Sequence, residues 1–251
     1  MRELFDDELK KLHGRFVEMG LTISEQIYKS TTAFIEHDKK AAQEVIDADE
    51  ETNSDEMKLE KQALSLIALQ QPVATDFRVI ISILKASSDL ERIGDHAVSI
   101  ARETIRVKGN PRIPKVEKAI AKMTEEVRDM LESALDAYVK SDADAAKKLS
   151  DNDVKVDEQY LLIRDEITEA VQSDTATIAA SSSYFMVIKL LERIGDHIVN
   201  LAEWIVYSAA GQIVELNPGK SNPELVDKLY SEAVIKEKGG SKDQKDNKKT
   251  K

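Results

Sequence analysis

Apolar residues recur from Phe5 to Ile23 at alternating steps of four and three positions. This spacing places them on one face of an α-helix, and its heptad rhythm is typical of helices that pack against other helices. The helix is predicted to run to about His37, after which the Asp38 carboxylate is suited to cap a second helix. The second helix is predicted to reach Leu69 and to end near Gln71 and Pro72, because proline disfavours the α conformation in the residue before it. The apolar positions of the first helix are Phe5, Leu9, Leu12, Phe16, Met19 and Ile23.

The same pattern begins again after a short segment that contains two prolines. A third helix is predicted over residues 73–107, and residues 109–114 are interpreted as a domain boundary. The remaining three helices are predicted from Val116 past Tyr138, from Ser141 or Asp142 to Val171, and from Ser173–Asp174 to a point between Gly211 and Pro218. The predicted fold class is therefore all-α. Six long helices form two pseudo-repeated three-helix bundles, at residues 1–110 and 115–217.

Composition supports long helices and excludes several kinds of chemistry. The 251 residues include only 9 Gly and 5 Pro, 33% are charged, and none is Cys. Thiolate metal sites, disulfides and cysteine nucleophiles are therefore excluded. The net charge of −11 argues against a nucleic-acid-binding protein.

Two features of the sequence bear on where the protein acts. It has no apolar run of the roughly 18 to 20 residues that a membrane-spanning helix needs, and its acidic start is unlike a signal peptide. A cytoplasmic protein without direct membrane insertion is predicted. Residues 236–251 hold seven Lys and no apolar residue, so a disordered basic tail is predicted there.

A seven-residue block occurs once in each half of the chain, as Leu-Glu-Arg-Ile-Gly-Asp-His at residues 90–96 and 191–197. The acids of each copy, Glu91 with Asp95 and Glu192 with Asp196, are four positions apart and share one helix face. Like charges at this spacing repel by a few tenths of a kcal/mol, and a mid-helix Gly costs roughly 1 kcal/mol relative to Ala. The duplication of both unfavourable features indicates that something offsets them.

Carboxylates on the preceding helix of each half offer a second acidic row. Adjacent helices in a bundle run antiparallel, so this row is expected to face the repeated block. Convergent carboxylate oxygens are ligands for hard cations, and one metal-binding patch per bundle is predicted. The first patch has an Asn in place of one carboxylate and is expected to be less charged. The candidate metal-binding residues are Asp49, Asn53, Glu91 and Asp95 in the first half, and Asp153, Asp157, Glu192, Asp196 and Asn200 in the second.

The same residues have a simpler interpretation, in which the acidic stripes only solvate the helices. The duplicated Gly favours the metal hypothesis, since solvation does not require it. His96 and His197 lie one step off the acidic face and are predicted to pack between helices or to form hydrogen bonds. Arg92 and Arg193 are predicted to pair with other helices or another subunit. No phosphate-binding loop, Glu-x-x-His pair or nucleophile–base spacing is present, so no enzyme is predicted.

The duplicated Glu-Arg-Ile-Gly-Asp-His block and the Gln-Pro-Val-Ala-Thr-Asp-Phe-Arg segment at residues 71–78 resemble the PhoU family. The resemblance covers about residues 1–220; Asn53 and the basic tail depart from the family pattern. It implies two three-helix bundles that bind metal clusters through Glu/Asp-x-x-x-Asp motifs, which match the positions given above. Iron or zinc is the metal that the resemblance implies. The residues alone leave divalent or trivalent ions open, including Mg and Mn.

The resemblance also implies a non-enzymatic role and a set of partners. Family members are commonly dimeric, repress the phosphate-starvation response and restrain phosphate import. They connect the phosphate ABC transporter, expected to be contacted at its ATPase subunit, to a sensor histidine kinase at the inner face of the membrane. Three alternatives stay open: a helical scaffold without metal-dependent function, a regulator of a different phosphate permease, and a metal-dependent hydrolase or ferroxidase.

Overall fold

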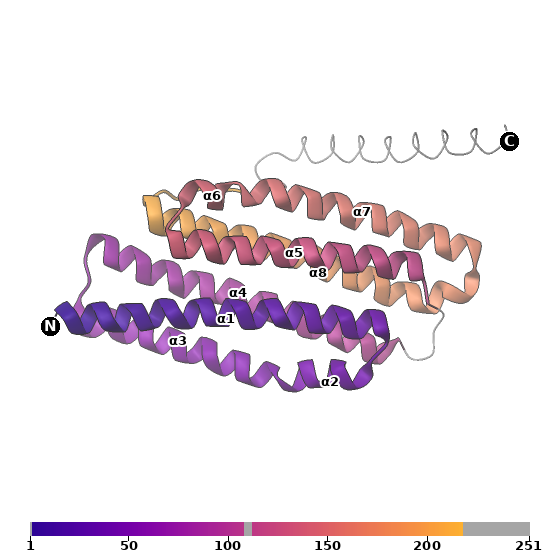
Figure 1. The fold of residues 1–251 in the computed structure, drawn as a ribbon, viewed down its shortest axis with the longest axis horizontal. Coiled ribbons are helices and arrows are strands. Elements are labelled where there is room, and N and C mark those ends of the chain that lie inside the picture. The colour runs from indigo at the N-terminus through magenta and orange to yellow at the C-terminus, as the bar shows by residue number, and fades with distance from the viewer. Residues whose placement is uncertain (1, 108–111, 218–251) are drawn as a thin grey trace.

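The computed structural model describes residues 2–107 and 112–217, with the backbone alone for residues 2 and 50–53. Within these ranges the chain is helical, without β-strands, and forms two bundles of three helical rods lying side by side (Figure 1). This confirms the predicted fold class. The first bundle contains α1 (Arg2–Glu36), α2 (Lys39–Asp47), α3 (Asp49–Gln70) and α4 (Ala74–Arg106). The second contains α5 (Pro114–Lys140), α6 (Ala143–Lys147), α7 (Leu149–Ser173), the 3₁₀ helix η1 (Thr175–Thr177) and α8 (Ile178–Ala210).

Aspartate caps set equivalent positions in the two halves. Asp38 accepts hydrogen bonds from the backbone N–H groups at the start of α2, at 2.9 and 3.0 Å. Asp142 does the same at the start of α6, at 3.1 and 2.9 Å. Both caps confirm the sequence prediction. The offset from Asp38 to Asp142 therefore relates α1–α3 of the first half to α5–α7 of the second.

The second rod of each half is interrupted, whereas a continuous helix was predicted. Ala48 separates α2 from α3, and Lys148 separates α6 from α7. At Lys148 the backbone N–H donates to Ala145 O at 3.2 Å, and Asp151 N donates to Lys148 O at 3.1 Å. These i→i−3 bonds tighten the helix locally into a turn. Neither break involves Pro or Gly, so the sequence carries no breaker signal there.

The two bundles share one hydrophobic core in the described ranges. α4 packs most extensively on α8, and α1 packs on α5. Most buried apolar side chains of both bundles form one contiguous cluster, and a small second cluster, with Val45 and Val98, lies within the first bundle. The domain boundary predicted at 109–114 stays a prediction, because residues 108–111 lie outside the described ranges. The predicted disordered tail, residues 236–251, also lies outside them.

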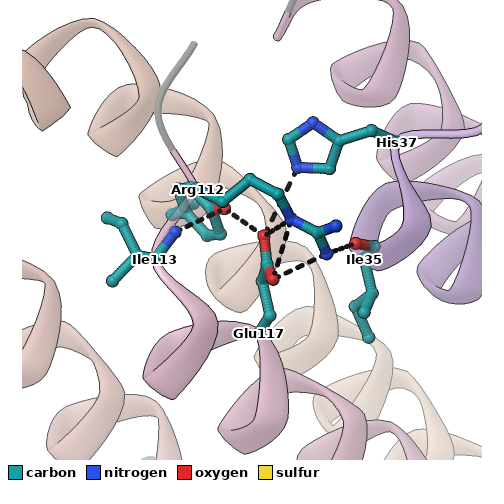
Figure 2. Close-up of polar contacts among 6 residues, drawn as sticks. Ile35, His37, Arg112, Ile113 and Glu117 are labelled. Carbon is teal, nitrogen blue, oxygen red and sulfur yellow. Dashed lines mark hydrogen bonds and ion pairs between the residues drawn. The ribbon is translucent and has the colours of Figure 1, made fainter.

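A buried carboxylate ties the start of α5 to three other segments (Figure 2). Glu117 is 4% exposed and accepts hydrogen bonds from Arg112 Nη2 at 2.8 Å and from the Tyr184 hydroxyl at 2.7 Å. His37 Nε2 lies 3.3 Å from the same carboxylate. Burial by itself raises the pKa of Glu117, but the hydrogen bonds from Arg112 and Tyr184 outweigh it, and the pKa is lowered overall. The carboxylate thus connects the turn after α1, the segment before α5, and α8.

None of the helices in the described ranges is both long and apolar enough to cross a membrane.

Candidate metal centres

Four carboxylates from α7 and α8 form the second acidic cluster, which comprises Asp153, Asp157, Glu192 and Asp196. Asp153 is 2% exposed, and its burial, together with the charges of the other three, raises its pKa to about 8. Burial and the charges of Glu192 and Asp196 raise the pKa of Asp157 to about 7. The predicted meeting of the α7 row with the repeated block on α8 is therefore confirmed. At neutral pH full ionisation of these four carboxylates is therefore unfavourable, and a bound cation would stabilise their ionised forms.

The glycine of the second repeated block makes room for this cluster. A Cβ atom at Gly195 would lie 2.6 Å from Asp153 Oδ1 and 3.4 Å from Val156 Cγ1. Ordinary Cβ contacts are never as short as the first of these distances. A mid-helix glycine therefore lets α7 bring a buried carboxyl group against the backbone of α8. This is a steric reason for a residue that helix propensity disfavours.

Two donors that the sequence analysis did not single out already contact the second acidic cluster. Lys189 Nζ lies 2.6 Å from both Glu192 carboxylate oxygens and 5.4 Å from the centre of the Tyr160 ring. Asn217 Nδ2 donates to Asp196 Oδ1 at 2.7 Å. Lys189 lies three residues before Glu192, a spacing that could have indicated it. Asn217 follows α8 by several residues, and no sequence pattern links it to Asp196.

The first acidic cluster, formed by α3 and α4, contains Asp49, Glu56, Glu91 and Asp95. Burial and the charge of Asp95 raise the pKa values of Asp49 and Glu91. Burial and the charges of Glu91 and Glu60 raise the pKa of Glu56 to about 7. The predicted approach of Asp49 to the first repeated block is thus confirmed.

Glu56 changes the predicted difference between the two clusters. It lies three residues after Asn53, on the same side of α3, and adds the carboxylate that Asn53 does not supply. The expectation that the first cluster is the less acidic one is therefore wrong. The Asn53 side chain lies outside the described side chains, so its predicted part in the cluster stays a prediction. Tyr160 occupies the position equivalent to Glu56 in the second half.

Arg92 belongs to the first cluster. Its guanidinium lies 3.5 Å from Glu91 Oε2 and 3.3 Å from Asp95 Oδ2, both on α4, and its positive charge also acts to lower the pKa of Glu56 on α3. The closest partners of Arg92 therefore lie on its own helix, and its predicted pairing with another helix or another subunit stays a prediction. Arg92 is thus a local counter-charge, as Lys189 is in the second cluster.

The histidines of the two repeated blocks meet where α4 crosses α8. The His96 and His197 rings are 5.5 Å apart between centroids, and burial together with the charges of His197 and Arg193 lowers the pKa of His96 to about 4. His197 Nδ1 lies 3.0 Å from Asp89 Oδ1. The same oxygen accepts a hydrogen bond from Asn200 Nδ2 at 3.2 Å. The histidines therefore pack between helices, as predicted, while the amide nitrogen of Asn200 points to Asp89 of the other bundle.

The donor set of each cluster suits a hard cation, since all the donors are carboxylate oxygens. Among the described side chains, however, no three Asp, Glu or His groups are placed as a metal ion requires. Glu192 is engaged by Lys189, and Asp196 by Asn217. Metal binding in the second cluster would therefore require these two side chains to turn away from their present partners.

The fold and these clusters define a class of protein: two copies of a three-helix bundle, each with an acidic cluster centred on the repeated block. The sequence model of the PhoU domain matches this chain twice, at residues 16–104 and 120–205. The chain belongs to the PhoU family.

Named relatives and solved structures are both similar to this chain over most of its length. The phosphate-specific transport system accessory protein PhoU homolog from Pseudomonas putida is 34% identical to this chain, over 82% of this chain and 81% of the relative. The homolog from Clostridium acetobutylicum is 35% identical, over 86% of this chain and 99% of the relative. The crystal structure of the phosphate transport system regulatory protein PhoU from Streptococcus pneumoniae matches with a TM-score of 0.78 and 32% identity, over 84% of this chain and all of that one. PhoU from Pseudomonas aeruginosa matches with a TM-score of 0.76 and 33% identity, over 83% of this chain and all of that one.

Proposed function

We propose that this protein is a non-enzymatic accessory protein of a phosphate-specific transport system, and that metal ions bound at its two acidic clusters are part of its function. The accessory role is supported by the names of relatives that align over most of the chain. The finer role carried by the family resemblance is repression of the phosphate-starvation response and restraint of phosphate import. In that role the protein connects the ABC transporter to a sensor histidine kinase.

The single observation that carries the metal proposal is the second acidic cluster, in which Asp153 is buried and the other three carboxylates are half-buried. Asp153 and Asp157 face Glu192 and Asp196 across the α7–α8 contact, and burial with mutual repulsion raises the pKa values of both aspartates. Removing carboxylates from water in this way is unfavourable unless a cation or protons neutralise them. Gly195 is the steric requirement for this placement.

The residues that would hold a metal ion are the four carboxylates of each cluster. A bound cation would supply charge neutralisation and a cross-link between neighbouring helices. In the second half, Asp153 and Asp157 would be joined to Glu192 and Asp196, with Lys189 displaced from Glu192. In the first half, Glu56 would take part with Asp49, Glu91 and Asp95. The metal is proposed to be iron or zinc, as in the family, with Mg and Mn as the other carboxylate-binding candidates.

Elemental mass spectrometry on gently purified protein tests the metal proposal. Wild type is compared with the double variant Glu192→Gln and Asp196→Asn, and with a matched control, Asp144→Asn and Glu169→Gln, at exposed positions. Metal retained by wild type and control and reduced in the cluster variant is the expected result. Equal metal content in all three proteins, or none after reconstitution, would leave the carboxylates as a solvating surface, the scaffold alternative.

Gene deletion tests the regulatory role separately. Starvation-induced phosphatase is expected to appear in phosphate-rich medium, with increased phosphate uptake. A strain that keeps both the repression and normal uptake would show that the role is wrong for this protein. The cluster variant, returned to the deletion strain, then shows whether metal binding is needed for repression.

A further inference from the structure

A groove runs along the outside of the first bundle, between α1 and the α2–α3 rod. Its volume is about 810 Å³, and its walls come from the second half of α1, from α2, and from the start of α3. A second hollow of about 510 Å³ continues it toward the N-terminus of α1, and Thr22 and Asp55 line both. α1 and the α2–α3 rod lie side by side in Figure 1, with the second bundle packed on the other side of α1 and α4.

The groove has an apolar lining that is partly open to water. Leu21 is 52% exposed and Tyr28 is 47% exposed, while Ala33 and Val45 lie buried at its base. Arg128 of α5 lies 5.1 Å from the centre of the Tyr28 ring, on the side toward the second bundle. Exposed apolar side chains gathered in one concavity are typical of a binding surface.

The rim of the groove is acidic. Glu25, Glu36, Glu44 and Asp55 line it, and Lys29 is the one basic residue among the described lining. Lys29 lies 3.5 Å from Glu25, Lys40 lies 3.8 Å from Glu44 and Lys58 lies 2.8 Å from Asp55; all of these side chains are more than half exposed, so the pairs are weak. Acids therefore outnumber basic residues in the described lining, over an apolar base.

The second half of the protein shows that the fold itself does not require this apolar lining. By the offset between the Asp38 and Asp142 caps, Leu21 corresponds to Glu125 and Tyr28 to Glu132, and both glutamates are exposed. Glu132 accepts a hydrogen bond from Ser24 of α1 at 3.0 Å, so the exchange of Tyr28 for glutamate lies at the contact between α1 and α5. Glu125 shows that the exposed position of Leu21 can be polar in this fold, and Leu21 therefore has a role that the repeated fold does not require.

We propose that this groove binds an amphipathic basic helix of a partner protein, with the apolar face of that helix on Leu21 and Tyr28 and its Lys or Arg residues beside the acidic rim. An apolar base with an acidic rim is complementary to such a helix in both polarity and charge. The stretch of α1 from Leu21 to Glu36 extends about 22 Å, which matches roughly four helical turns. The proposal names the kind of partner that the adaptor holds and so rests on the proposed function.

The test measures binding of a labelled synthetic helix by fluorescence anisotropy to the full-length protein. The probe is a peptide of about 18 residues with Leu at i, i+3, i+4 and i+7 positions and Lys elsewhere. The key variant, Leu21→Glu with Tyr28→Glu, gives the groove the residues of the second half. Its matched control, Val139→Glu with Met186→Glu, adds the same charge at exposed apolar positions outside the groove.

The key variant separates docking from simple charge attraction. Groove binding predicts at least tenfold weaker binding by the key variant and no loss in the control. General attraction of a basic peptide to an acidic protein predicts equal or tighter binding by the key variant, since it carries two more negative charges; that result overturns the proposal.

Two other occupants have their own signatures, and each would also overturn the proposal. A peptide of residues 236–251, basic but without apolar residues, would bind as tightly as the synthetic helix if the chain's own tail were the occupant. If a second copy filled the groove, the wild-type dimer would exclude the probe, and sedimentation would show the key variant as a monomer. Metal content is measured on the same proteins. If the protein binds the peptide normally but contains no metal, only the metal proposal is contradicted. If the protein contains metal but does not bind the peptide, only the groove proposal is contradicted.

Discussion

Protein freed of metal by EDTA is expected to lose stability as the pH rises from 6.5 to 8.5, chiefly through Asp153. Burial, helped by the charges of Asp157, Asp196 and Glu192, raises the pKa of this carboxyl group to about 8. In the unfolded chain the same group has a pKa of about 3.9, so it is ionised throughout this pH range. The folded state therefore holds a proton that the unfolded state lacks, and stability falls as the pH rises through the folded-state pKa.

The size of the effect follows from the two pKa values. Integrating the proton linkage from pH 6.5 to 8.5 at about 1.36 kcal/mol per pK unit gives a loss of about 2 kcal/mol from Asp153. Asp157, with a pKa raised to about 7, adds about 1 kcal/mol. His96 works in the opposite direction, because burial lowers its pKa to about 4 and its contribution rises with pH. The unfolded histidine is still half protonated at pH 6.5, so about 0.4 kcal/mol of that gain falls between pH 6.5 and 8.5 and offsets only a small part of the loss.

Urea unfolding in EDTA at pH 6.5, 7.5 and 8.5 measures the loss directly. Asp153→Asn keeps the size of the side chain but cannot ionise, so its free energy of unfolding is expected to vary with pH by about 2 kcal/mol less than that of wild type. Asp144→Asn, at an exposed position, is the control and should follow wild type. A wild-type stability that is flat or rising over this range, and unchanged in slope by Asp153→Asn, would refute the argument that the cluster is buried at the expense of ionisation.

Three further substitutions test the contacts around the clusters and the bundle interface. Gly195→Ala should lower the free energy of unfolding by about 1 to 3 kcal/mol through overpacking. Gly14→Ala is the control: a Cβ there would meet nothing within 4 Å, so this change should raise the free energy of unfolding by up to about 1 kcal/mol. Equal changes of the two variants in urea unfolding would contradict the steric role of Gly195. Glu117→Ala should lower the free energy of unfolding by about 3 kcal/mol, because the buried Tyr184 hydroxyl loses its acceptor and the buried carboxylate loses its ion pair with the half-exposed Arg112 guanidinium, which regains water. A double-mutant cycle with Tyr184→Phe that shows no coupling would count against this. Asn217→Ala removes a donor to Asp196 and should speed amide hydrogen exchange over residues 211–217 while leaving α1 unchanged; unchanged exchange over 211–217 would mean that other contacts hold the segment.

Helix positions followed from the sequence because local signals agree with the global packing. The apolar period defined the buried face of α1, and the aspartate caps marked where α2 and α6 begin. The breaks at Ala48 and Lys148 could not be predicted, because each is a small change in backbone torsion at a residue compatible with a helix.

The clusters were predictable where both partners lie on a helical period. The four-residue spacing of the repeated block and the antiparallel neighbour were enough to bring Asp153 to Glu192 and Asp196. Glu56 was not predicted, although it lies on the same side of α3 as Asn53, because it stands three residues from Asn53 and outside the four-residue spacing of the other acids. Asp89, which meets His197 across the bundle interface, has no signal in the sequence, since the contact depends on how α4 crosses α8.

The two halves keep one backbone plan but differ in what their surfaces can bind. The second cluster has Asp157 and is contacted by Lys189 and Asn217, so a cation bound there would have to compete with both for the same carboxylates. The first cluster replaces Asp157 by Asn53 and gains Glu56, on the half that also carries the apolar groove. Tyr28 and Glu132 both take part in the contact between α1 and α5, through Arg128 and Ser24, whereas Leu21 and Glu125 are exposed at equivalent positions of the two halves. The divergence at Leu21 therefore argues that the first half is the one that holds a partner helix, and exchange of Leu21 and Tyr28 should separate partner binding from metal binding.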